Sequence, residues 1–184
     1  MRQENLFSGD IRKVNMQRGR ESEEAFRQWH RERNIKLIET GWQNWGISKK
    51  AMDHMRDILA PKNFTLLGYH CFNALRYFPD FLVNGDTYVD VKWSQNPRYP
   101  DTVGISLDAY KGYCSLSEFF TDKDIYICWH TGEGLFEGVN IGKLNEDDLE
   151  STKSSSGGPF LRIPKKIISN YMESGILDRK AVNF

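Results

Sequence analysis

The chain has little cysteine and no long apolar segment. Its three cysteines, Cys71, Cys114 and Cys128, are odd in number and lack the spacing of a metal site. We therefore expect reduced, buried thiols in a cytoplasmic protein. No apolar run approaches the length that spans a membrane, and the N-terminus lacks the apolar segment of a secretory signal. These absences argue against a disulfide framework and against a membrane partner.

The chain also lacks a net charge, because 25 basic side chains balance 25 acidic ones. This balance argues mildly against a large nucleic-acid footprint. The charges are unevenly distributed, however: residues 1–36 are rich in Lys and Arg, whereas residues 145–150 are mostly acidic. A local basic surface matters more for nucleic-acid binding than the sum does.

The 184 residues predict a single domain, 1–184, with an α/β fold in which helices flank a mixed central β-sheet. Residues 1–18 are polar and predict an N-terminal arm, and residues 41–77 form an insertion before the central motif. Residues 151–158 predict a flexible loop. Expected helices span residues 20–37, 48–59, 105–120 and 165–177. Expected strands span residues 64–67, 81–83, 88–93, 124–130, 135–141 and 160–163.

The most informative segment is the stretch FPDFLVNGDTYVDVKWS. Asn84-Gly85 predicts a tight two-residue turn between two strands, because both positions of that turn need a positive φ. In the second strand side chains alternate, so Asp90 and Lys92 share one face while Val91 lies on the other. Asp80 stands where the neighbouring strand begins. Two carboxylates and an amine are therefore expected to converge at one end of the sheet.

A third carboxylate is expected from the helix at residues 20–37. With about 100° per residue, Phe26, Trp29 and Leu37 form one apolar face, and Glu23 lies roughly 70° from its centre. Glu24 and Glu21 point away from that face. Glu23 is therefore the acid of this helix that can lean toward a buried site while the helix packs.

These residue types suit phosphodiester hydrolysis. Hard cations bind carboxylate oxygens, and Mg²⁺ keeps several waters for its substrate. Such a cation lowers the pKa of its water and stabilises the developing charge. Lys92, as a compact positive charge, can orient the water or offset charge in the transition state.

The order of a helical Glu, Pro79-Asp80, Asp90-Val91-Lys92, a helix and a strand resembles the PD-(D/E)xK nuclease superfamily. The segment RGRESE, residues 18–23, is similar to the Gly-x-x-x-Glu opening of archaeal Holliday-junction resolvases. The resemblance implies the restriction-endonuclease-like fold. It also implies that Glu23, Asp80 and Asp90 bind Mg²⁺ or Mn²⁺, with Lys92 beside the attacking water.

The expected activity is that of a metal-dependent endonuclease on DNA, with Arg20, Arg76 and Lys111 contacting nucleic acid. Structure-selective cutting is a further hypothesis that rests on the resolvase resemblance, and a homodimer would follow from it. Two alternatives stay open: an RNA-cleaving nuclease of the same fold, and a non-catalytic module that binds nucleic acid or protein.

Overall fold

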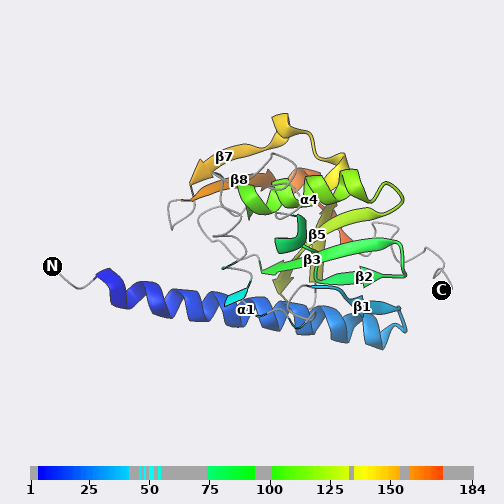
Figure 1. The fold of residues 1–184 in the computed structure, drawn as a ribbon, viewed down its shortest axis with the longest axis horizontal. Coiled ribbons are helices and arrows are strands. Elements are labelled where there is room, and N and C mark those ends of the chain that lie inside the picture. The colour runs from blue at the N-terminus through cyan, green and yellow to red at the C-terminus, as the bar shows by residue number, and fades with distance from the viewer. Residues whose placement is uncertain are drawn as a thin grey trace.

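The computed structural model describes residues 4–41, 46, 48, 50–51, 54, 74–93, 101–132, 135–153 and 158–171. Two helices and a six-stranded sheet form its main body (Figure 1). The helices are α1 (Glu4–Glu32) and α4 (Leu107–Phe119). The strands of this sheet, in spatial order, are β1 (Leu37–Glu39), β2 (Phe81–Val83), β3 (Thr87–Trp93), β5 (Asp124–Gly132), β6 (Leu135–Asn140) and β9 (Ser169–Asn170).

The sheet is mixed. Strands β1, β2 and β3 are antiparallel neighbours, and the chain then crosses through α4 to β5, which runs parallel to β3. Strands β6 and β9 continue the sheet in antiparallel fashion. The expectation of a mixed central sheet with helices on its faces is confirmed.

A second, three-stranded antiparallel sheet lies beside the main body. It consists of β4 (Thr102–Ser106), β8 (Pro159–Pro164) and β7 (Glu150–Lys153), in that spatial order. Short 3₁₀ helices connect the C-terminal strands: η2 (Ile141–Lys143), η3 (Glu146–Asp148) and η4 (Lys165–Ile167).

The sheet separates two apolar cores. On one side, Phe26 and Trp29 of α1 pack on Val89 and Val91 of β3. On the other side, α4 packs on a core that includes Tyr88 of the same strand. The alternation expected along β3 is therefore confirmed, and Figure 1 shows the two helices on opposite faces.

The hairpin between β2 and β3 turns where the sequence predicts it. Asn84 and Gly85 both have positive φ, 52° and 80°. Because Val83 pairs with Thr87, the loop holds three residues rather than two, with Asp86 added after the turn. The backbone N–H of Asp86 donates to the carbonyl of Val83, which closes the turn.

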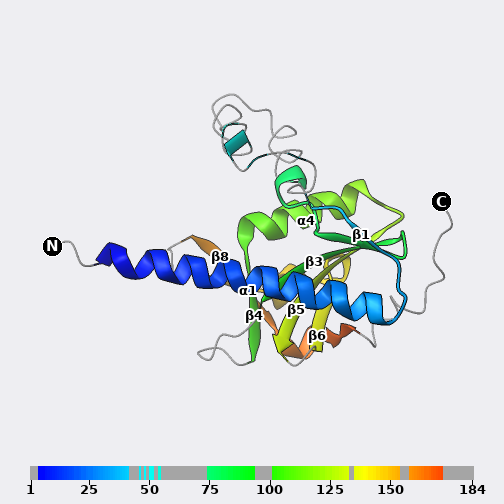
Figure 2. The same ribbon diagram turned by 90° about the horizontal axis from the view of Figure 1, so that it is seen from below.

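The helix predicted from residue 20 begins earlier, at Glu4, so the described part of the predicted N-terminal arm at residues 1–18 is helical. Its N-terminal half projects past the sheet (Figures 1 and 2). The helix also ends earlier than predicted, at Glu32. Asn34 adopts a left-handed φ of 54°, and Ile35 N–H donates back to the carbonyl of His30. Because the helix ends here, Leu37 lies outside it and is the first residue of β1.

Three other boundaries correct the predictions. The helix predicted from residue 105 begins at Leu107, where Ser106 Oγ accepts from the N–H of Ala109, and Ile105 is a buried β4 residue. Part of the predicted loop 151–158 pairs with β8 as strand β7. The helix predicted at 165–177 is wrong for residues 165–170, where the chain forms η4 and β9, because residues 169–170 extend the main sheet along β6; residues 172–177 lie outside the described residues.

The predicted insertion lies outside the described residues, apart from a few positions. At Ser48, Oγ accepts a hydrogen bond from the N–H of Ala51, as expected for a helix cap. The remainder of the predicted helix 48–59 and the predicted strand 64–67 lie outside the described residues. Within the described residues, no helix has the length and apolar character needed to cross a membrane.

Candidate active site

Asp80, Asp90 and Lys92 meet at the end of the β2–β3 hairpin. Asp80 directly precedes β2, and its Oδ2 accepts a hydrogen bond of 3.0 Å from the backbone N–H of Val91. Asp90 lies across from it on β3 with 6% of its side chain exposed, and it forms an ion pair with Lys92. The alternation of β3 and the antiparallel register therefore bring together the three groups that the sequence predicted.

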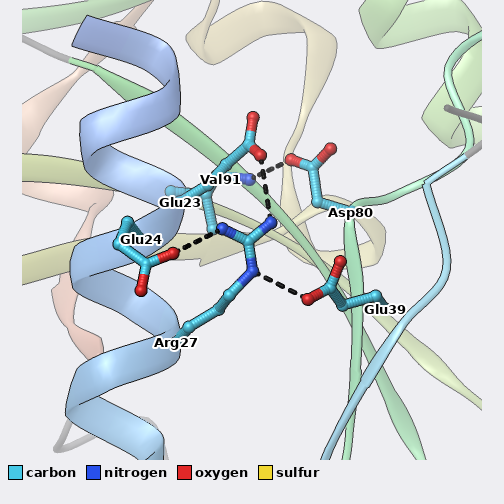
Figure 3. A network of polar contacts seen from close by, with 6 residues as sticks. All are labelled: Glu23, Glu24, Arg27, Glu39, Asp80 and Val91. Atoms are coloured by element: carbon cyan, nitrogen blue, oxygen red, sulfur yellow. Dashed lines mark hydrogen bonds and ion pairs between the residues drawn. The ribbon is translucent and has the colours of Figure 1, made fainter. Parts of the chain in front are cut away.

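Glu23 approaches the same place from α1. Its Oε2 lies 3.5 Å from Nη2 of Arg27. The same guanidinium contacts Glu24 through Nη1 at 3.1 Å and Glu39 of β1 through Nε at 2.9 Å. Arg27 thus ties the helix to the edge of the sheet and holds Glu23 toward Asp80 (Figure 3). Glu24 faces solvent, as the helical geometry predicted.

Burial and repulsion between neighbouring acids both raise the pKa of Asp80 and of Glu23. Burial is the largest cause that raises the pKa of Asp80, and the charges of Asp90 and Glu23 add to it; against the opposing effect of Lys92, the result is a pKa of about 7. Burial also raises the pKa of Glu23, with Asp90 adding to the shift and Arg27 opposing it. The charges of neighbouring acids therefore add to the effect of burial at both Asp80 and Glu23, as expected for carboxylates that share one site.

Lys92 remains a cation in this site. Burial alone would lower its pKa, but Asp90 and Asp80 outweigh that effect and raise it above the ordinary value. The buried hydroxyl of Tyr113 on α4 adds a hydrogen bond to Asp90, and burial raises the pKa of that hydroxyl well above its usual range. Tyr113 therefore positions Asp90, and Asp90 in turn pairs with the ammonium group of Lys92.

A cavity of about 510 Å³ opens over these groups. Glu23, Asp80 and Lys92 line one part of it, and Asp90 forms an ion pair with Lys92 without lining the cavity. The cavity has α1 on one side and the small sheet on the other. Its remaining lining residues are Asn15, Arg18, Gly19, Val91, Trp93, Thr102, Val103, Gly104, Phe160 and Arg162.

The predicted nucleic-acid contacts do not line this cavity. Arg20 is exposed on α1 and Lys111 is exposed on α4, and Arg76 lies over the ring of Tyr77 at 5.3 Å. The arginines that do line it are Arg18 and Arg162. Arg162 shares a face of β8 with Phe160, opposite the buried Leu161 and Ile163, so strand alternation was the available signal.

The donor set suits a hard divalent cation, because all three acids offer carboxylate oxygens whose repulsion a cation would relieve. In the described ranges, however, no three His, Cys, Asp or Glu side chains are placed so that they could hold a metal ion as they stand. Protein donors engage each acid instead: Arg27, Val91 N–H and Lys92. Metal binding therefore requires these side chains to exchange partners, and it stays a prediction.

Gly19 offers a test of the cavity wall. A Cβ added there meets no atom within 4 Å, and Gly19 lies inside α1. Gly19→Ala is therefore expected to raise the free energy of unfolding by about 0.5–1 kcal/mol, because alanine favours helix. Chemical denaturation measures this change in the free energy of unfolding. As the control, Gly104→Ala should destabilise, since its Cβ would overlap the ring of Phe160; equal effects would contradict this description.

No family profile, curated protein or solved structure matches this chain.

Proposed function

We propose that the protein is a metal-dependent endonuclease that hydrolyses phosphodiester bonds in DNA. One observation carries this proposal: Glu23, Asp80 and Lys92 come from three separate segments and line one cavity, and Asp90 forms an ion pair with Lys92. A carboxylate cluster of this kind serves no packing purpose, since burial and the neighbouring acids disfavour the charged forms of Asp80 and Glu23 in the folded protein.

The order of elements supports the same proposal. The order of elements along the chain is similar to that of the PD-(D/E)xK superfamily. It runs from the helix with Glu23, through the strands that follow Asp80 and carry Asp90 and Lys92, to the helix α4 and the parallel strand β5. We infer a restriction-endonuclease-like fold on this basis. The second sheet and the N-terminal half of α1, which precedes Glu23, would be additions to it.

The residues divide the chemistry among them. Glu23, Asp80 and Asp90 would bind Mg²⁺ or Mn²⁺, which supplies an acidified water and neutralises the phosphate. Lys92 stays protonated, so its role is to place positive charge beside the phosphate oxygens and not to accept a proton. Water would attack phosphorus in line and lose a proton to solvent, while the bond to the leaving oxygen breaks and that oxygen takes up a proton from solvent.

Cleavage assays with Lys92→Met test the proposal. Wild type should cut plasmid or branched DNA with Mg²⁺ or Mn²⁺, and the variant should be slower by about 10²–10³-fold, because the charge beside the phosphate is lost. Lys123→Met is the matched control, since Lys123 pairs with the exposed Asp122 outside the cavity. RNA in the same panel separates a ribonuclease. If wild type cleaves no substrate with either metal, the proposal that the protein is a nuclease is wrong.

A further inference from the structure

The cavity extends beyond the acids into a region with a different chemistry. There, the lining consists of Arg18 and Asn15 of α1, Trp93 at the end of β3, and Phe160 and Arg162 of β8. Two guanidinium groups and two aromatic rings in one hollow suit a ligand that is both anionic and flat. A nucleotide has both properties.

The aromatic side chains are held in place by their surroundings. The Arg18 guanidinium lies over the ring of Trp93 at 5.7 Å from its centroid. The ring of Phe160 occupies the space that a Cβ at position 104 would need, so only glycine lets it lie against β4. Both rings are half-buried and line the cavity, which leaves part of each available to a ligand.

Aromatic rings inside a cavity, as at Trp93 and Phe160, favour an unpaired base over a paired one. In a duplex the base faces are stacked on one another, so an aromatic side chain can contact a face only after the base has left the stack. Aromatic rings together with basic side chains are the usual means of binding single strands. The volume, about 510 Å³, lies in the range of cavities that hold one small ligand.

We propose that this part of the cavity receives one unpaired nucleotide next to the scissile phosphate, stacked on Phe160 or Trp93 with its phosphates near Arg18 and Arg162. The inference rests on the proposed nuclease function and narrows it. The substrates would be single strands, mismatched bubbles and frayed ends of DNA, in preference to intact duplex.

One oligonucleotide sequence tests this in three forms: single strand, fully paired duplex and duplex with a central unpaired bubble. With Mn²⁺, wild type should cut the single strand and the bubble at least tenfold faster than the duplex. Phe160→Ala should reduce those two rates about tenfold or more, in keeping with the loss of one base-stacking contact. Phe119→Ala is the matched control, because Phe119 is 79% exposed and lies outside the cavity.

A second measurement separates this inference from the catalytic proposal. Fluorescence anisotropy with a labelled oligothymidine in EDTA measures binding without cleavage, and Phe160→Leu replaces Phe160→Ala if thermal melting shows that the latter is unfolded. Binding that weakens in the Phe160 variants supports the nucleotide site even if wild type cuts nothing. Equal cleavage of duplex and single strand, or variants that bind and cut as wild type does, would overturn the inference and leave the nuclease intact.

Discussion

Asp80→Asn is expected to abolish hydrolysis and, in the same protein, to stabilise the fold above pH 7. Asparagine keeps the shape of the side chain and an oxygen that can accept from Val91 N–H, 3.0 Å away in the wild type. It removes the negative charge that a divalent cation would need. We expect a loss of activity of about 10³-fold or more, since one cation ligand is lost from the centre of the proposed site.

The gain in stability follows from the direction of the pKa shift. Asp80 has an ordinary pKa of 3.8 in the unfolded chain and about 7 in the folded one, so the folded state holds its proton more tightly. Between these values wild-type stability falls as the pH rises. The full shift would correspond to about 4 kcal/mol, and because the side chain is partly exposed we expect about 2 kcal/mol. The neutral asparagine avoids this cost.

Urea denaturation at pH 4 and pH 8 measures the effect. The difference between Asp80→Asn and wild type should be near zero at pH 4 and about 2 kcal/mol at pH 8. Asp122→Asn makes the same change at a side chain that is 74% exposed, and it should alter neither stability nor activity appreciably. A less stable Asp80→Asn at pH 8 would mean that the folded protein does not disfavour the ionised Asp80 carboxylate as described.

Together these results would distinguish a functional cluster from a structural one. A carboxylate kept for stability should weaken the fold when its charge is removed. A carboxylate kept for binding a cation does the opposite, because the apo protein bears the repulsion that the ligand relieves. Calorimetric titration with Mn²⁺ adds an independent check: wild-type affinity should rise with pH through about 7 as Asp80 loses its proton.

The acids and Lys92 could be predicted from sequence because local rules place them. Asn84-Gly85 determines where the hairpin turns, and alternation along β3 then puts Asp90 and Lys92 on one face. Helical periodicity places Glu23 near the edge of the packed face of α1. Each of these steps uses neighbours within a few residues, where backbone geometry leaves few choices.

The remainder of the cavity depends on contacts between distant segments. Arg162 and Phe160 reach it because β8 pairs with β4, about 60 residues earlier in the chain. No local pattern specifies that pairing. The helix prediction for residues 169–170 was wrong for the same reason. Their conformation depends on pairing with the distant strand β6, whereas the local sequence around the preceding lysines is typical of a helix.

Acid is expected to destabilise the fold through His30, the most buried histidine among the described residues. Its Nδ1 lies 2.8 Å from the carbonyl of Phe26 and its Nε2 lies 3.1 Å from the hydroxyl of Tyr171, with no part of the residue exposed. The hydroxyl can donate to Nε2 only while the ring is neutral. Burial accordingly lowers the pKa of His30 to about 4, against a small opposing effect of the Phe26 carbonyl.

The sign of the pH effect follows from that shift. The unfolded chain takes up a proton at His30 near pH 6.5 and the folded chain only near 4, so stability is complete above 6.5 and is lost as the pH falls between these values. The loss should reach about 3 kcal/mol at pH 4. His30→Gln stays neutral, so the difference in unfolding free energy between wild type and variant, measured by urea denaturation, should shrink by that amount from pH 7 to pH 4. A difference independent of pH would mean that His30 is charged in the folded protein or that its core opens to water.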